Sequence, residues 1–563
     1  MKHVLGTLIF LLCCITFDAQ RRSCSSPIYC EGELLHLIQK SKIFNDSKTF
    51  VDMAMKNPVN KTLENFDLFM RKTDSKPTVN EINMFVQENF QMVGEMEDFY
   101  PRDWRAEPRI VKEIEDPKVR NFLKTLISIW PQLCRKISQY VFDQPERFSL
   151  IPVRNAFIIP GGRFKEFYYW DSYWILKGLL LTDMKETAKG VIDNFLFMVS
   201  TYGFIPNGGR VYYLNRSQPP VLTLMMKDYI KYTKDFEFLR QNIHVLEQEL
   251  QFWLKKRVVK LNLNGEIYQL AHFDSESNTP RPESYLEDLK TCSVYNTTEA
   301  IQECYTDLKS GAESGWDFSS RWIFDEKGEP SDDLSKIHTR RNIPVDLNSF
   351  LYKSFKIMQN FYQILRQPTD AKYWQEVAEM WQYNIERVLY SPDDGIWFDY
   401  DIKLNRPRKY FAASNFAPLW AEAMDEEVKK ERGSNAVQYL KKYGILDYHG
   451  IPSTLFNTGL QWDFPNVWSP YQNIIIFGLE QTGDEEAQEV ARVLALRWVQ
   501  SNIKAYDENK VMFEKYSAKV SGAFGGGGEY HIQSGFGWTN GAIMEIIDSY
   551  FRVKSRKYIA ATD

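Results

Sequence analysis

Apolar residues recur at intervals of three and four along most of the chain, which is the spacing that one face of an α-helix requires. A clear case lies between positions 351 and 381, where two such stripes flank the pair Pro368-Thr369, a combination that ends one helix and starts the next. The pattern predicts a helical hairpin. Its apolar positions are Leu351, Phe355, Met358, Tyr362, Leu365, Trp374, Val377, Ala378 and Trp381.

Comparable stripes cover 183–201, 234–256, 482–503 and 536–553, separated by loops rich in Gly, Pro and Asn. Thr182 and Asp183 are candidate N-terminal caps for the first of these stripes. Strand-like alternation is rare and brief. Successive helical hairpins without a β-rich block predict one all-α domain of paired helices, either a solenoid or a closed toroid. The connections that carry unusual motifs would line one end of this domain.

The first 20 residues are typical of a secretory signal peptide. Lys2 and His3 precede the apolar run VLGTLIFLLCCITF, which is short for a membrane span, since a spanning helix needs roughly 20 apolar residues. The tail carries no lipid-anchor signal. We therefore expect a secreted, extracellular protein with no membrane anchor. Residues 21–110 are more polar and predict an N-terminal extension packed on the core, and 556–563 form a polar tail.

Cysteine usage fits an oxidising compartment. Short segments separate Cys24 from Cys30 and Cys292 from Cys304, which favours a bridge within each pair, although the spacing does not exclude other pairings. Cys134 lies in an apolar helical stretch and is expected to be a buried free thiol.

Four N-glycosylation sequons begin at Asn45, Asn60, Asn215 and Asn296. Asn215 stands next to Arg216, in a segment that is assigned to the ligand site below. A glycan there would block access, so we expect the other three to be the acceptors.

Composition narrows the range of ligands. The net charge of -5 gives no electrostatic reason to expect nucleic acid or an anionic membrane surface as a partner. Phe, Trp and Tyr make up 15% of the chain, enough to build both a large core and aromatic walls for a ring-shaped ligand.

Two motifs indicate what that ligand is. The segments PGGRFKEFYYWDSYW at 160–174 and QWDFPNVWSP at 461–470 crowd glycine, arginine, tryptophan and carboxylate into short spans. Sugar hydroxyls favour forked charged donors such as arginine, and the C–H faces of sugar rings favour aromatic platforms. Cleavage of the bond between two sugars needs paired carboxylic acids. The motifs therefore predict a site for a sugar.

Two carboxylates stand out by their neighbours. Asp317 lies between Trp316 and Phe318, and an apolar environment raises the pKa of a carboxyl towards that of a general acid. Glu514 follows an apolar run and precedes Lys515, whose charge would favour an ionised general base. A buried ion pair or a helix cap is the alternative for each.

Arginines in glycine-, proline- or asparagine-containing loops are a second group, and they indicate a close approach of the backbone to a polar ligand. They are Arg163, Arg210, Arg216 and Arg281. The segment GAFGGGGEY at 522–530 lacks the ending of a phosphate-binding loop, and we interpret it as a mobile lid with Glu529 as its one chemically useful side chain.

These residues carry a resemblance to a known family. The chain resembles the α,α-trehalases of the animal secreted or surface type, which split trehalose into two glucose molecules. Both family signatures are present, PGGRFKEFYYWDSY in full and QWDFPNVWSPYQ with Val467 at a position that is often glycine. The resemblance implies an (α/α)6 toroid over residues 111–555, an inverting mechanism, and no metal or organic cofactor.

The resemblance also implies roles for individual residues. The general acid of the family corresponds to Asp317 and its general base to Glu514. The sugar-binding set corresponds to Arg163, Phe164, Trp170, Asp171, Asn207, Arg216, Arg281, Glu283, Gly315, Trp462 and Glu529. Positions equally compatible with a supporting place behind the site are Arg210, Asp463 and Gln472.

In such a reaction Asp317 protonates the leaving oxygen while Glu514 deprotonates a water on the opposite face, which needs carboxyls about 6.5–9.5 Å apart. The expected partner is trehalose alone, bound by a monomer or a loose dimer. Two alternatives stay open. One is an inverting α-glucosidase similar to glucoamylase on the same toroid, and the other is a secreted sugar-binding protein that has lost activity.

Overall fold

The structure is a computed structural model that describes residues 24–553. The predicted signal peptide (1–20) and polar tail (556–563) lie outside the described residues. None of the helices within 24–553 combines the length and the apolar character that a membrane crossing requires.

Six helices form a closed ring at the centre of the molecule. Each contacts the next, and the last, α20, packs along the first, α8. Almost every residue of α8 and α18 is buried, as expected for helices that are covered on all sides. The ring consists of α8 (Asp171–Leu181), α10 (Leu222–Thr233), α14 (Val345–Ile364), α16 (Ala417–Ala421), α18 (Ser469–Glu480) and α20 (Gly537–Phe551).

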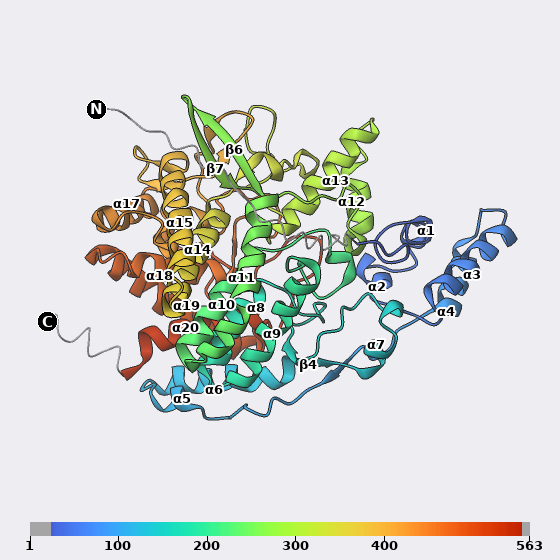
Figure 1. The fold of residues 1–563 in the computed structure, drawn as a ribbon, viewed down its shortest axis with the longest axis horizontal. Helices are drawn as coiled ribbons and strands as arrows, with labels where there is room; N and C mark the ends of the chain where they lie inside the picture. The colour runs from blue at the N-terminus through green and yellow to red at the C-terminus, as the bar shows by residue number, and fades with distance from the viewer. Residues whose placement is uncertain (1–23, 554–563) are drawn as a thin grey trace.

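A second layer of helices surrounds this ring (Figure 1). These outer helices are amphipathic: α15, for example, buries Trp374, Ala378 and Trp381 and leaves its other face in solvent. The layer consists of α6 (Pro117–Leu133), α9 (Lys185–Tyr202), α11 (Phe236–Lys256), α15 (Pro368–Val388), α17 (Lys429–Lys442) and α19 (Glu485–Asn509). The prediction of an all-α toroid is confirmed, and the contact of α20 with α8 excludes an open solenoid.

The predicted caps of α9 are wrong. Thr182 ends the preceding helix α8, where its hydroxyl donates to the carbonyl of Gly178 at 2.8 Å. Asp183 adopts a left-handed backbone (φ 62°) in the tight connection, and α9 begins only at Lys185. Because the segment before Thr182 is itself helical, the hydroxyl caps a carbonyl instead of an amide.

Residues 24–98 carry four helices that lie beside the ring, with α3 and α4 at the right edge of the view in Figure 1. A small apolar cluster holds this N-terminal segment together and extends to Tyr168, Tyr212 and Tyr213 of the main body. The helices are α1 (Glu33–Ser41), α2 (Ser47–Val51), α3 (Val59–Lys72) and α4 (Val79–Asn89). Three short helices, α5 (Arg109–Lys112), α7 (Gln139–Asp143) and α12 (Tyr285–Cys292), and the longer α13 (Thr298–Glu313), complete the set.

Strands are short, and all the sheets of the described residues have two or three strands. The longest pair is the antiparallel hairpin of β6 (Val258–Leu263) and β7 (Glu266–Ala271), which projects at the top of Figure 1. Its turn is Asn264-Gly265, with both residues at positive φ, as a two-residue hairpin turn favours. The others are β1 (Ala54–Met55), β2 (Phe90–Gln91), β3 (Met96–Asp98), β4 (Cys134–Ile137), β5 (Phe157–Ile158), β8 (Asn342–Ile343), β9 (Tyr390–Ser391), β10 (Ile396–Trp397), β11 (Tyr400–Asp401), β12 (Arg406–Pro407), β13 (Asn466–Val467) and β14 (Tyr516–Ser517).

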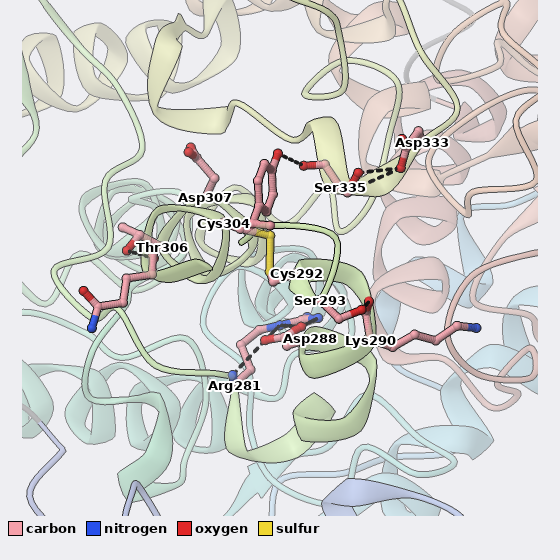
Figure 2. The surroundings of a disulfide bond; sticks show 12 residues. Arg281, Asp288, Lys290, Cys292, Ser293, Cys304, Thr306, Asp307, Asp333 and Ser335 are labelled. Carbon is pink, nitrogen blue, oxygen red and sulfur yellow. Dashed lines mark hydrogen bonds and ion pairs between the residues drawn. A yellow bond between two sulfur atoms is a disulfide. The ribbon is translucent and has the colours of Figure 1, made fainter. Parts of the chain in front are cut away.

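The cysteines pair as the short spacing favours. The structure contains the Cys24–Cys30 and Cys292–Cys304 bridges, and Cys134 is buried and free. Figure 2 shows that the second bridge ties the end of α12 to α13. Asp288, four residues before Cys292 in α12, faces Arg281. The bridge therefore helps to fix a helix that supports an arginine of the predicted site.

Candidate active site

A cavity of about 960 Å³ opens at one end of the ring, and every predicted site residue lines it. Most of the lining comes from segments that precede the N-termini of five ring helices, α8, α10, α14, α18 and α20, and Asn45 and Asp46 add to it. These segments are 160–171, 207–218, 281–317, 461–468 and 514–538. The closed ring thus brings together motifs that lie hundreds of positions apart in the sequence.

Asp317 lies shortly after the end of α13, in a partly buried position. Burial raises the pKa of its carboxyl to about 7, while the nearby Arg281 guanidinium acts in the opposite direction. Gln461 donates a hydrogen bond to its backbone carbonyl. A carboxyl held in this way keeps its proton up to about neutral pH and has the property of a general acid.

Glu514 reaches the cavity from a fixed backbone. The indole of Trp538 donates to its carbonyl at 3.2 Å, and Tyr530 donates to its Oε1 at 2.8 Å. Its Oε2 lies 3.8 Å from Lys515 Nζ and is buried without a hydrogen bond from the described residues. Burial raises the pKa of Glu514, and the Lys515 charge, which the sequence led us to expect to favour the ionised form, offsets this only in part.

The arginines form ion pairs around the cavity. Arg216 Nη2 lies 2.6 Å from Glu283 Oε1, and Arg281 Nη2 lies 2.6 Å from Asp288 and 3.1 Å from Glu529. Burial alone would raise the pKa of Glu283, but the two guanidiniums lower it below its ordinary value. The pairs are incomplete, because Arg216 Nε and Nη1 and Glu283 Oε2 are buried without a hydrogen-bond partner among residues 24–553. Such orphaned polar atoms require a polar ligand or water.

Aromatic rings form another part of the cavity wall. Trp462 and Trp468 stack with ring centroids 4.0 Å apart, and Trp170 packs against Trp462 and Trp538. Gly315 makes this packing possible, because it has a φ of 76° and a Cβ there would lie 2.6 Å from the Trp170 ring. Its role is steric: it lets the wall approach the turn that carries Asp317.

The remaining predicted residues also lie in the cavity. Phe164 contacts Tyr530 edge-on, and the Asn207 amide donates to two backbone carbonyls at 3.3 Å. Burial raises the pKa of Asp171 well above its usual range, and the charges of the two candidate catalytic carboxyls add to the effect.

The glycine-rich segment 522–530 covers the cavity, but Glu529 is not its only functional side chain. Tyr530 follows Glu529 and donates a hydrogen bond to Glu514. The loop is also firmly packed: the amide of Gly526 donates to Asn466, and a Cβ on Gly527 (φ 76°) would lie 2.1 Å from the Gly459 carbonyl oxygen. The close approach explains the run of glycines.

Three residues for which the sequence left a supporting place open lie behind the cavity and support its walls. Arg210 is buried in an ion cluster with Glu166 and Glu95. Asp463 accepts hydrogen bonds from four hydroxyls and the amide of Ser320, and Gln472 pairs with the backbone of Ile451. None of the three lines the cavity. Cavity residues that the sequence did not single out include Asp46, Gln218, Gln461, Trp468, Tyr530 and Gln533.

The reason given for excluding the Asn215 sequon is wrong. Asn215 does not line this cavity but a separate one of about 510 Å³, together with Phe204 and Phe252, while its neighbour Arg216 points the other way. Asn45, one of the three expected acceptors, is exposed and lines the main cavity. Asn215 lies in a turn, where adjacent residues face different sides, so proximity in sequence to Arg216 was a poor guide.

The chain is similar to known proteins over nearly its whole length. Residues 42–551 match the family model described as Trehalase. A trehalase of Tenebrio molitor is 51% identical over 530 residues, which cover 94% of this chain and 96% of the relative. The trehalase of Homo sapiens is 43% identical over 529 residues, covering 94% and 90%. Among solved structures, the neutral trehalase of Saccharomyces cerevisiae aligns with a TM-score of 0.56 at 24% identity over 72% of this chain and 76% of that chain, a likeness of fold.

Proposed function

Because the chain belongs to the trehalase family and is a glycosidase that hydrolyses trehalose, we propose that Asp317 is its general acid and Glu514 its general base. The observation that carries this assignment is the contrast between the two carboxyls in one cavity. Asp317, with its pKa raised to about 7, holds a proton to give, and Glu514 presents a buried oxygen that accepts no hydrogen bond from the described residues.

The acid step acts on the oxygen that joins the two glucose units. Asp317 transfers its proton to this oxygen as the bond to the anomeric carbon breaks, so that the departing glucose leaves as a neutral alcohol. Partial burial and the apolar neighbours Trp316 and Phe318 keep the carboxyl protonated before the reaction. After the transfer its carboxylate is stabilised by Arg281, whose charge lowers the pKa of Asp317.

The base step acts on a water on the opposite face of the sugar. Glu514 Oε2 accepts a proton from this water as its oxygen bonds to the anomeric carbon. Tyr530 occupies the other oxygen, so one lone-pair direction of the carboxylate is left for the water. The charge of Lys515 compensates part of the cost of keeping Glu514 ionised in a buried site.

The other cavity residues bind the two glucose rings. The unpaired atoms of Arg216 and Glu283 would find partners in sugar hydroxyls, and Trp170 and Trp462 offer apolar ring faces. The cavity volume is at the upper end of the range for small-molecule sites, about 300–1,000 Å³, which suits a disaccharide and excludes a polymer from full enclosure.

Substrate selectivity tests this arrangement. We expect the purified protein to release glucose from trehalose and no glucose above background from maltose, since the polar groups of the cavity are placed for one linkage between two glucose units. Comparable rates on both sugars would favour a glucoamylase-like enzyme, and glucose release from neither would favour a sugar-binding protein. The family assignment does not favour either alternative.

We also propose a cellular setting and an organisation for the chain. The protein is secreted after removal of residues 1–20, its residues 111–555 form the catalytic domain, and residues 21–110 are an extension that packs on it. It acts as a monomer or a loose dimer. The Cys24–Cys30 and Cys292–Cys304 pairs support the secreted route, because disulfides persist in oxidising compartments.

A further inference from the structure

The candidate base is held by a residue of the lid. Tyr530 OH donates to Glu514 Oε1 at 2.8 Å, while Oε2 accepts no hydrogen bond from the described residues. Tyr530 is half-buried and belongs to a segment without regular secondary structure, between the glycine run and α20. The orientation of the Glu514 carboxylate therefore depends on how this segment is placed.

Two cations lie over the Tyr530 ring. The Arg163 guanidinium lies 5.0 Å from the ring centroid and Lys515 Nζ lies 5.4 Å from it, and Phe164 packs edge-on at 5.3 Å. Cations over an aromatic face are attracted to its negative quadrupole. In addition, the Arg163 amide donates to the side chain of Gln533 at 2.8 Å, which ties the arginine loop to the same lid segment.

Arg163 is in turn clamped from the N-terminal segment. Its Nε lies 3.0 Å from Asp46 Oδ2 and its Nη2 lies 2.8 Å from Asp46 Oδ1, a forked pair that fixes the plane of the guanidinium. Nη1 makes no hydrogen bond with the described residues, and Arg163 lines the cavity. Asp46 also caps α2 by accepting from the amide of Lys48 at 2.9 Å, so its own position is fixed.

We infer that Tyr530 is a positioning residue for Glu514, and that Asp46 of the N-terminal segment holds Tyr530 in place through Arg163. The inference deepens the proposed function, because it rests on Glu514 as the general base. It makes the N-terminal segment a part of the catalytic apparatus, although the segment lies beside the ring and contributes neither the acid nor the base.

The charges around Glu514 set the sign of the expected effect. Burial raises its pKa, whereas Lys515, the hydrogen bond from Tyr530 and the charge of Arg163 lower it. Two further carboxyls face this group: the charges of Glu514 and Asp317 both raise the pKa of Asp171. Removal of the Tyr530 hydroxyl takes away one of the lowering contributions, so the pKa of the base must rise, and the acid limb of the rate profile must move to higher pH.

The test is the pH dependence of kcat and KM on trehalose for Tyr530→Phe. We expect kcat to fall by about 10- to 100-fold, since a hydrogen bond to a charged group is lost, with KM changed much less and the acid limb shifted upward. The matched control is Tyr362→Phe, which removes a tyrosine hydroxyl that donates to Glu247 outside the cavity at 2.9 Å. Its profile should equal that of the unmodified protein. An unchanged kcat and acid limb in Tyr530→Phe would overturn the inference.

A second variant tests the link to the N-terminal segment and does not depend on the first. Asp46→Asn keeps a residue that caps helices well but removes the charge that clamps Arg163. We expect a lower kcat in this variant, and a much smaller further effect when Asp46→Asn is added to Tyr530→Phe, because the two changes act through one contact chain. Asp98→Asn, at an exposed ion pair of the same segment, is the control. Independent, additive effects on kcat would contradict the link. If Glu514→Gln retained normal activity, the proposed base itself would fail, which is a separate result.

Discussion

Replacement of Asp317 by Asn should leave a folded protein whose kcat on trehalose is lower by about 10²–10⁴-fold, because the amide has no proton to give to the leaving oxygen. The shape of the side chain is kept, so KM should change much less than kcat. Steady-state glucose release, corrected for folded protein by circular dichroism, measures the effect. Asp332→Asn, an exposed aspartate outside the cavity, is the matched control and should retain full activity.

Stability separates this loss from unfolding. Burial raises the pKa of Asp317 from 3.8 to about 7, so between these values the folded protein keeps a proton that the unfolded chain has lost. Stability due to this group is present below the lower value and falls as the pH rises through the window. Asp317→Asn removes the penalty, and its melting temperature at pH 7 should equal or exceed that of the unmodified protein. A near-normal kcat would refute the role of Asp317 as the acid.

Replacement of Glu514 by Gln should lower kcat by a similar factor of about 10²–10⁴, since the attacking water then has no base. Gln retains an oxygen for the hydrogen bond from Tyr530, so the lid segment should stay in place. Sodium azide gives a second readout, because this anion needs no base to attack the anomeric carbon. We expect azide to restore cleavage in Glu514→Gln and to yield a β-glucosyl azide.

The azide experiment also discriminates between the two carboxyls. In Asp317→Asn the leaving oxygen still lacks its proton, so azide should not restore cleavage of trehalose. The exposed Glu508→Gln serves as the control and should behave as the unmodified protein with and without azide. Rescue of Asp317→Asn but not of Glu514→Gln would exchange the two roles.

The ring of paired helices could be predicted because its signal is local. Apolar stripes identified α9, α11, α14, α15, α19 and α20 to within a few residues, since each stripe reports one buried face. The hairpin of β6 and β7 was missed, although its Asn264-Gly265 turn is a recognised signal between two short strands. The caps at Thr182 and Asp183 failed because the helix that ends there was not recognised, and the same residue types serve both ends of a helix.

The site was predictable where residue type alone carries the chemistry. Arginines among glycines and carboxyls among aromatics were identified from their neighbours, and the structure brings all of them except Arg210 to one cavity. Asp46 and Tyr530 were not, because their relevance lies in contacts with Arg163 and Glu514 across long stretches of sequence. Asp46 stands in a polar segment like many surface aspartates, and only the fold places it at the cavity. The two sequons at Asn45 and Asn215 illustrate the same limit.

The anomeric form of the fresh products tests the central claim, that Asp317 and Glu514 act as an inverting acid and base pair. Both anomeric carbons of trehalose are α. Water delivered by Glu514 attacks one of them from the face opposite the departing oxygen, so this glucose is released as β, while the other glucose keeps its own carbon–oxygen bond and stays α. Proton NMR in the first minutes, before mutarotation mixes the forms, should therefore show equal amounts of β- and α-glucose. Two α-glucose molecules per trehalose would indicate a covalent intermediate and contradict the assignment.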